Sequence, residues 1–194
     1  LMNTLITGII STVLALIAGG TLAWCVVRSN MPGKRWLQPI LTLPYILPSF
    51  AIALAWETVF RRPIVGGQPG LYEGILGIAP PEWLSYGVIP MSITLAIHYF
   101  PLAYLLVAGA LATIDSQMEE SALISGAGKL TILRRITFPV VAPAFVAALI
   151  LTFGKTIGQF ALPFLLGAPT QFHTVATMIY ANLALGLDSM AYVL

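Results

Sequence analysis

Residues 1–27 of the chain contain no charged side chain, and further long uncharged stretches follow at 36–56, 83–114, 136–154 and 156–187. A helix needs about 20 consecutive apolar residues to cross the hydrocarbon of a bilayer. The chain is 58% hydrophobic and only 8% charged, whereas about a quarter of the residues of a soluble domain are charged. The sequence therefore predicts one all-α domain over residues 1–194, a polytopic bundle of transmembrane helices.

The last uncharged stretch, residues 156–187, is not predicted to form one straight helix. It is interrupted by Pro163, Gly167, Pro169 and Gly186. Irregular backbone is tolerated at membrane depth where protein encloses it or where it lines a cavity. We therefore expect re-entrant segments here, a short helix over 174–185, and a further crossing that begins near Asp188. Because the chain starts at Leu1 and ends in mostly apolar residues, we also expect it to be part of a longer chain.

Basic residues are concentrated in two of the three predicted connections. Those two connections hold Arg28, Lys34, Arg35, Lys129, Arg134 and Arg135. The connection over 61–82 has only Arg61 and Arg62. Cytoplasmic loops of membrane proteins carry an excess of Lys and Arg, so the first two connections are predicted to be cytoplasmic. The net charge of +2 is too small to indicate a nucleic-acid partner, and membrane lipid is the expected surrounding.

The cytoplasmic connection over residues 115–138, here called the 115–138 loop, is unusually polar for this chain. Its start fits a capping box, in which the side chain of Ser116 caps a helix and Glu119 reaches back to it. That helix is expected to continue to Ser125. Glycines at 126 and 128 then favour a break, because glycine readily adopts the left-handed conformation that ends helices.

A second short helix is expected over 129–137, after which Pro139 opens the next span, where its missing N–H costs little. The predicted unit is a helix–turn–helix on the membrane surface. On physical grounds alone it fits two interpretations equally well. It is either an amphipathic loop resting on lipid head groups or a docking surface for another protein.

The spacing of residues in this loop resembles a known family. Glu120-Ser121-Ala122, three residues, Gly126, nine residues and Ile136-Thr137-Phe138-Pro139 resemble the EAA loop of ABC-type importer permeases. The family pattern is Glu-Ala-Ala, three residues, Gly, nine residues, Ile, any residue, Leu-Pro, so this chain departs from it at Ser121 and Phe138. The stretches LPYILPSFAIALAW and GQFALPFLLG also resemble MetI-like permeases that serve ferric iron, thiamine, polyamines and phosphonates.

The resemblance implies a multi-pass permease subunit in a bacterial inner membrane, with no cofactor and no enzymatic activity of its own. ATP hydrolysis is then expected on a separate cytoplasmic ABC ATPase dimer. A periplasmic or lipoprotein binding protein delivers a small solute, ferric iron being favoured. The second permease half is either a homodimer partner or part of the same longer chain. The implied ATPase-coupling residues are Glu120, Ser121, Ala122, Gly126, Ala127, Ile136 and Pro139.

A few residues outside the loop are candidates for the solute path, each with a structural alternative. Pro44 and Pro48 predict either a packing kink or a hinge for alternating access. Ionisable groups inside spans are costly and usually face the protein interior, so His98 is either a hydrogen-bonded packing residue or part of the path. The remaining path candidates are Glu57, Tyr99 and Gln159.

The sequence offers little support for other classes of protein. An ion-coupled secondary transporter or channel is the alternative function, but it predicts carboxylates within the spans, and Glu57 lies near the end of one. The chain has no glycine loop for phosphate that ends in Lys-Ser or Lys-Thr. Its single cysteine and two widely separated histidines give no metal-binding spacing.

Overall fold

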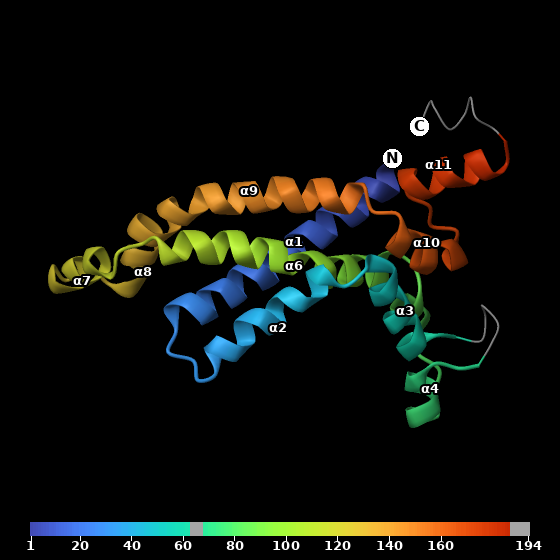
Figure 1. The fold of residues 1–194 in the computed structure, drawn as a ribbon, viewed down its shortest axis with the longest axis horizontal. Coiled ribbons are helices and arrows are strands. Elements are labelled where there is room, and N and C mark those ends of the chain that lie inside the picture. Colours follow the sequence, from blue (N-terminus) through green and yellow to red (C-terminus); the bar gives the residue numbers. More distant parts are fainter. Residues whose placement is uncertain (63–67, 187–194) are drawn as a thin grey trace.

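The computed structural model describes residues 1–62 and 68–186, and the regular elements within these ranges are helices (Figure 1). They are α1 (Met2–Arg28), α2 (Lys34–Ile46), α3 (Ser49–Phe60), α4 (Leu71–Leu76), α5 (Glu82–Ser85), α6 (Val88–Ala112), α7 (Ser116–Ile124), α8 (Lys129–Ile132), the π-helix η2 (Leu133–Thr137), α9 (Phe138–Ile157), α10 (Ala161–Gly167), the 3-10 helix η3 (Ala168–Thr170) and α11 (Val175–Ala184). Within the described ranges, three helical stretches are long and apolar enough to cross a membrane: Met2–Arg28, Glu82–Ala112 and Leu130–Ile157. The predicted all-α membrane bundle is confirmed. The crossing expected from Asp188 lies outside the described residues.

The bundle is built around α1, which packs against α6 and α9 and has a buried face of small side chains. This face holds Thr7, Ser11, Ala15, Gly19 and Ala23, all buried and each four residues from the next. Residues four apart lie on the same side of a helix, so they form one continuous stripe. At Gly19 an added Cβ would lie 2.6 Å from the carbonyl oxygen of Phe100. Small residues at this spacing let membrane helices approach closely, which explains the tight packing of α1 on α6.

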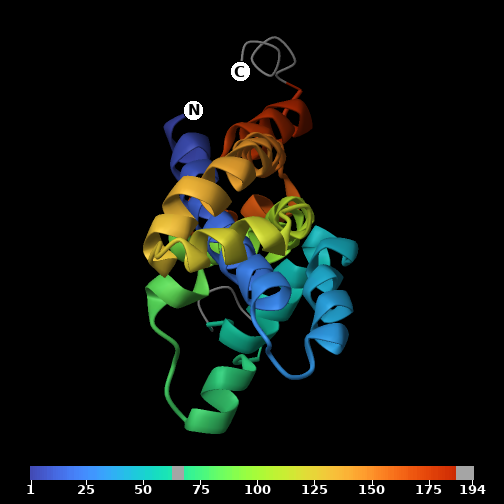
Figure 2. The same ribbon diagram turned by 90° about the vertical axis from the view of Figure 1, so that its left-hand side faces the viewer.

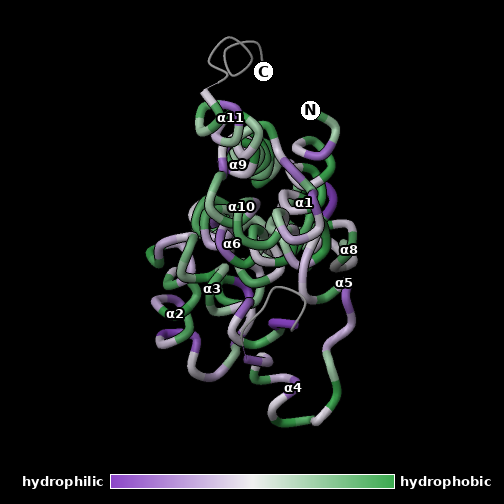
Figure 3. Tube along the Cα trace, turned by 90° about the vertical axis from the view of Figure 1, so that its right-hand side faces the viewer, coloured by the Kyte–Doolittle hydropathy of each residue, from purple (hydrophilic) through white to green (hydrophobic). Residues whose placement is uncertain are grey.

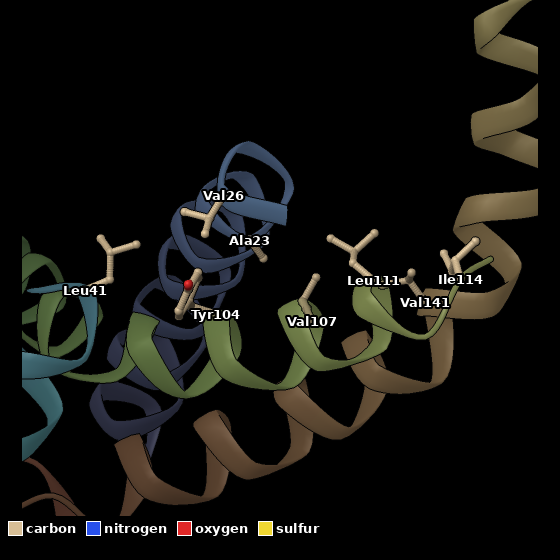
Figure 4. Packing of buried hydrophobic residues seen from close by; sticks show 8 residues of the cluster. All are labelled: Ala23, Val26, Leu41, Tyr104, Val107, Leu111, Ile114 and Val141. Carbon is tan, nitrogen blue, oxygen red and sulfur yellow. The ribbon is translucent and has the colours of Figure 1, made fainter. Parts of the chain in front are cut away.

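Two clusters of buried hydrophobic residues hold the helices together, and α6 contributes to both. The first joins α1, α2, α6 and α9 (Figure 4) and contains Ala23, Val26, Leu41, Tyr104, Val107, Leu111, Ile114 and Val141. The second joins α3, α6 and α10 and contains Ala53, Met91, Leu95, Tyr99, Leu162 and Leu166. The central helix α6 is therefore fixed along most of its length by apolar contacts.

Polar contacts join the first turn of α1 to residues 173–175, at the start of α11. The backbone N–H of Val175 donates to Thr4 Oγ1 at 2.9 Å, and Asn3 Nδ2 donates to the carbonyl of His173 at 3.0 Å. Helix α11 itself starts with a capping box formed by Thr174 and Thr177. The short helix predicted over 174–185 is thus confirmed, and it is tied to the start of the chain.

The uncharged stretch over residues 36–56 forms two helices that are together long and apolar enough for one broken span. Helices α2 and α3 are 13 and 12 residues long, each shorter than the roughly 20 residues that a crossing needs. They meet at 96°. The bend falls at Leu47 and Pro48, which both have extended backbone, because a residue before proline disfavours the helical conformation. The predicted proline kink is present, but it is close to a right angle.

The two basic connections lie toward the same end of the elongated molecule (Figure 1). Arg28 lines one cavity together with several residues of the 115–138 loop, among them Leu123 and Leu130, so the two connections are neighbours. Helix α4 projects from the bundle on another side in both ribbon views (Figures 1 and 2). Hydrophilic residues gather in the connections near α4 and α5, whereas α9 and α10 are mainly hydrophobic (Figure 3).

Candidate functional site

The 115–138 loop begins with a capped helix, as predicted, but the cap is a different residue. The side chain of Asp115 accepts a hydrogen bond from the backbone N–H of Gln117 at 2.9 Å. Ser116, the predicted cap, is instead the first residue of α7. Asp is among the best N-cap residues and its charge also favours a helix N-terminus, so the helix starts one residue earlier than the capping-box pattern indicates.

Helix α7 ends in a Schellman turn centred on Gly126. The backbone N–H of Gly126 donates to the carbonyl of Leu123 at 3.0 Å, and that of Ala127 donates to the carbonyl of Ala122 at 3.0 Å. These are the two hydrogen bonds of this motif, which requires a left-handed residue after the helix. Gly126 has a φ of +83°. The predicted break at this glycine is confirmed, and its conformation explains why a glycine is needed there.

The second helix of the loop is not separate from the next span, and this part of the prediction is wrong. Helix α8, η2 and α9 follow one another without a break. Proline inside a helix clashes with the carbonyl four residues earlier, which for Pro139 is the carbonyl of Arg135. That carbonyl lies in the π-turn η2, where the N–H of Phe138 donates to Leu133. The wider turn accommodates Pro139, so the loop continues directly into α9.

The loop exposes several large apolar side chains. Ile124 is 88% exposed and Met118 54% exposed, both on α7 (residues 116–124), and Leu130 of α8 is 61% exposed. Exposed apolar residues in this number on a polar connection mark a protein or membrane contact. Sequence reasoning did not single out Met118 and Ile124. Met118 and Ile124 lie six residues apart within a short helix whose other residues are mostly polar. This contrast with their polar neighbours was the one feature of the sequence that could have identified them.

The coupling residues implied by the resemblance occupy different environments. Glu120 lies within α7, and its side chain is outside the part that the structure describes. Ser121 is exposed and its carbonyl accepts from the backbone N–H and the hydroxyl of Ser125, at 3.1 and 2.9 Å. Ala122, Ala127 and Ile136 are half-buried, whereas Gly126 and Pro139 are exposed. Ser121, Ala122, Gly126 and Ala127 thus come together at the C-terminal turn of α7, while Ile136 and Pro139 lie further along, at the junction with α9.

His98 has a structural partner in the α2–α3 bend. Its Nδ1 lies 2.8 Å from the carbonyl oxygen of Pro44. In a continuous helix that carbonyl would accept from residue 48, but Pro48 has no N–H. Because a carbonyl only accepts, the Nδ1 of His98 carries the proton and donates it. His98 therefore satisfies a part-buried backbone carbonyl that the proline bend leaves without its helical partner.

This hydrogen bond predicts how His98 variants behave. Leaving a fully buried carbonyl unsatisfied costs about 1–3 kcal/mol. The carbonyl of Pro44 is part-buried, so His98→Leu is expected to cost about 1 kcal/mol and to lower the thermal unfolding temperature of the detergent-purified permease. His98→Asn places an amide donor near the position of Nδ1 and should recover most of that loss. Equal destabilisation by both variants would show that the hydrogen bond contributes nothing. Full stability with lost solute uptake would favour a role in the path instead.

The other path candidates are not gathered at one point. The ring of Tyr99 packs edge-on against that of His98, with 4.6 Å between ring centroids. Glu57 instead forms an ion pair with Arg61, at 3.2 Å between Oε1 and Nη2. The amide oxygen of Gln159, which follows α9, accepts from the backbone N–H of Phe160 at 3.2 Å. These contacts link His98 and Tyr99 to the bend, whereas Glu57 and Gln159 interact with residues near them in the sequence.

Residues 11–194 match the family described as the inner membrane component of binding-protein-dependent transport systems. The chain belongs to this family. Two curated relatives share part of its length. A probable sulfate transport permease, cysT of Helicosporidium sp. subsp. Simulium jonesii, is 32% identical over 160 residues, which cover 80% of this chain and 54% of the relative. The molybdenum transport permease ModB of Escherichia coli (strain K12) is 28% identical over 161 residues, covering 81% of this chain and 67% of ModB.

The chain therefore spans little more than half the length of the sulfate permease that it matches. Solved structures agree on the fold. A bacterial ABC transporter involved in the import of alginate has a TM-score of 0.77 at 20% identity, covering 98% of this chain and 69% of the solved chain. The inward-facing MetNI methionine ABC transporter has a TM-score of 0.69 at 18% identity, covering 99% and 84%. The MetI-like helical bundle implied by the resemblance is confirmed, as is the multi-pass inner membrane location of the family.

Proposed function

We propose that this chain is the transmembrane permease part of an ATP-driven importer, and that the 115–138 loop docks on a separate cytoplasmic ABC ATPase dimer. The observation that carries this proposal is the exposed apolar end of α7, capped by Asp115 and ended at Gly126. This surface lies at the basic end of the molecule, where positively charged connections favour the cytoplasm. Family membership supports the same function.

Because α8, η2 and α9 are continuous, a movement of the 115–138 loop is transmitted directly to the membrane-spanning helix α9. When ATP binding closes the ATPase dimer, a docked α7 (residues 116–124) moves with it. The Schellman turn, held by two backbone hydrogen bonds, passes that movement to α8. No flexible connection lies between α8 and α9, so the displacement reaches the bundle. The bundle then alternates between inward-open and outward-open states, and a binding protein outside delivers the solute. A second permease half completes the path.

Substitution of Gly126 tests whether movement is transmitted through this turn, and the nearby Gly128 provides the control. An added side chain at Gly126 has open space around it but a φ of +83°, which costs a residue with a Cβ about 1–2 kcal/mol. Gly128 also has open space and has no positive φ. A cost of this size at Gly126 lowers the equilibrium constant for forming the turn about five- to thirtyfold. Gly126→Ala is therefore expected to reduce uptake by that factor while ATP hydrolysis persists. Gly128→Ala should behave like the unaltered protein.

Uptake and ATP hydrolysis are measured together, in proteoliposomes that contain the complete transporter. Gly126→Asn is a second control, because asparagine tolerates the left-handed conformation better than alanine does. Full uptake by Gly126→Ala, or equal loss with Gly128→Ala, would contradict the proposal. Uptake driven by an ion gradient without any ATPase would instead favour a secondary transporter.

For the solute, we propose a small oxyanion of the sulfate or molybdate type. The support is that two relatives carry those names, at 32% and 28% identity. Ferric iron, favoured by the earlier resemblance, has no counterpart among the relatives described above. Competition of labelled sulfate uptake by molybdate, and its absence with ferric iron, is the expected result. Uptake of iron but not of either oxyanion would overturn this assignment.

A further inference from the structure

The 96° bend between α2 and α3 lies at the depth of the membrane spans. The carbonyl of Pro44, just before the bend, is bonded to His98, which lies near the middle of the span Glu82–Ala112. Lipid offers no hydrogen-bond partner at this depth, so irregular backbone is tolerated only where protein encloses it or where it lines a water-filled cavity. Tyr45 and Phe50, on either side of the bend, are 37% and 53% exposed. The described part of the chain therefore does not enclose the bend.

The start of α3 leaves two backbone donors at the bend. The first N–H groups of a helix have no acceptor inside it, and in α3 only that of Ala51 is provided for, by the carbonyl of Pro48 at 2.9 Å. Within the described residues, the N–H groups of Ser49 and Phe50 have no acceptor, and no side chain caps the helix. An N–H group only donates, so its partner must be an acceptor such as oxygen. The positive end of a helix also favours a negatively charged partner.

A buried hydroxyl group lies beside these donors. Tyr99 is only 6% exposed, and its hydroxyl has no hydrogen-bond partner among the residues that the structure describes. Its ring centroid lies 6.3 Å from that of Tyr45, in the last turn of α2. Tyr99 also belongs to the same buried cluster as Ala53, which lies one turn after Ser49 in α3. The side chain from α6 thus packs against both helices that form the bend.

We propose that the α2–α3 bend binds the solute during its passage, with oxygen atoms of an oxyanion accepting from the N–H groups of Ser49 and Phe50 and from the hydroxyl of Tyr99. The site presupposes the oxyanion solute proposed above and gives it a place in the bundle. A tetrahedral oxyanion presents acceptors in several directions, so it can accept from α3 and from α6 together. Half-helices inside transporters direct their N-termini at anionic groups in this way.

Removing the hydroxyl of Tyr99 tests the side-chain donor. Tyr99→Phe keeps the ring, and the affinity of the purified complete permease for radiolabelled sulfate, without the binding protein, is expected to fall about tenfold or more, as for the loss of one hydrogen bond to a charged group. Tyr104→Phe is the matched control. Tyr104 also lies on α6, is 1% exposed and has a hydroxyl without a partner in the described residues, but it belongs to the other buried cluster. Tyr104→Phe should bind sulfate like the unaltered permease.

Two substitutions of Ser49 isolate the backbone donor. Ser49→Ala removes the hydroxyl alone, whereas Ser49→Pro removes both the hydroxyl and the N–H. Proline is well tolerated at the first position of a helix, and Pro48, with a ψ of 135°, already has the conformation that suits a residue before proline. Ser49→Pro is therefore expected to bind sulfate about tenfold more weakly than Ser49→Ala. Thermal unfolding of each variant shows that it is folded.

ATP-driven sulfate uptake by the complete transporter, measured in parallel, separates the site from the choice of solute. If the unaltered transporter takes up sulfate but Tyr99→Phe and Tyr104→Phe bind it equally, the site is overturned while the proposed function stands. Equal sulfate binding by Ser49→Ala and Ser49→Pro, or uptake without measurable sulfate binding to the permease, would have the same consequence. If the unaltered transporter takes up no sulfate, the proposed solute is wrong and the site falls with it.

Discussion

Replacing Ile124 with glutamate is expected to abolish ATP-driven uptake while the permease still folds and inserts. Ile124 is 88% exposed at the end of α7, so the free permease loses almost no packing. In a docked complex the same side chain is buried, and an unpaired carboxylate there is strongly unfavourable. Loss of a central interface residue costs about 2 kcal/mol or more, which corresponds to binding of the ATPase subunit at least roughly thirtyfold weaker.

The chain offers a matched control at the opposite end of the bundle. Ile75 is 79% exposed on α4, and Ile75→Glu makes the same change on a surface with no proposed role in coupling. Ile124→Leu keeps an apolar side chain and should retain most activity. Binding of the ATPase subunit to purified permease is the measurement. Unchanged binding by Ile124→Glu, or equal loss with Ile75→Glu, would remove α7 from the interface.

Substitutions at Gly19 are expected to have the largest effect on folding. A Cβ at this position would lie 2.6 Å from the carbonyl oxygen of Phe100 and 2.7 Å from the backbone nitrogen of Tyr104. Backbone atoms of α6 can move only if the whole helix moves. Gly19→Ala is therefore expected to cost about 1–3 kcal/mol, as for other overpacked sites. Gly19→Leu should prevent the permease from accumulating in the membrane.

Gly109 provides the comparison for Gly19, because it lies in α6 with nothing within 4 Å of an added Cβ. Gly109→Ala removes the helix penalty of glycine, about 1 kcal/mol in water, and should leave stability unchanged or raised. Thermal unfolding of purified Gly19→Ala and Gly109→Ala is the measurement. If Gly19→Ala is as stable as Gly109→Ala, the close contact of α1 with α6 is not what holds the bundle.

The membrane spans could be predicted from the sequence because the uncharged runs are long and because a helix surrounded by lipid exposes apolar side chains. Helices α1, α6 and α9 lie within or close to the runs that predicted them. The packing of the helices against one another was harder to predict from the sequence. The stripe from Thr7 to Ala23 contacts α6 at Gly19, but small residues at a spacing of four do not identify their partner helix. Likewise, the prolines predicted a kink between α2 and α3, but local sequence predicted neither its angle of 96° nor the contact of His98 with Pro44 beside it.

Predictions within the 115–138 loop were most accurate where the backbone conformation of one residue determines the local structure. Gly126 was expected to end α7, and its positive φ confirms this. The cap was misplaced by one residue, because Asp115 and Ser116 are both good caps and local pattern alone does not rank them. The separation of α8 from α9 was wrong, because Pro139 normally marks a helix start and the sequence does not reveal the π-turn that accommodates it.

The central claim, that α7 contacts the ATPase subunit, is tested most directly by photo-cross-linking. Cys25, the single cysteine, is replaced by alanine, and a benzophenone is attached to Ile124→Cys or, as a control, to Ile75→Cys in the assembled transporter. The account predicts an adduct between permease and ATPase from position 124 and none from position 75. No adduct from position 124, or an adduct of equal yield from position 75, would contradict it.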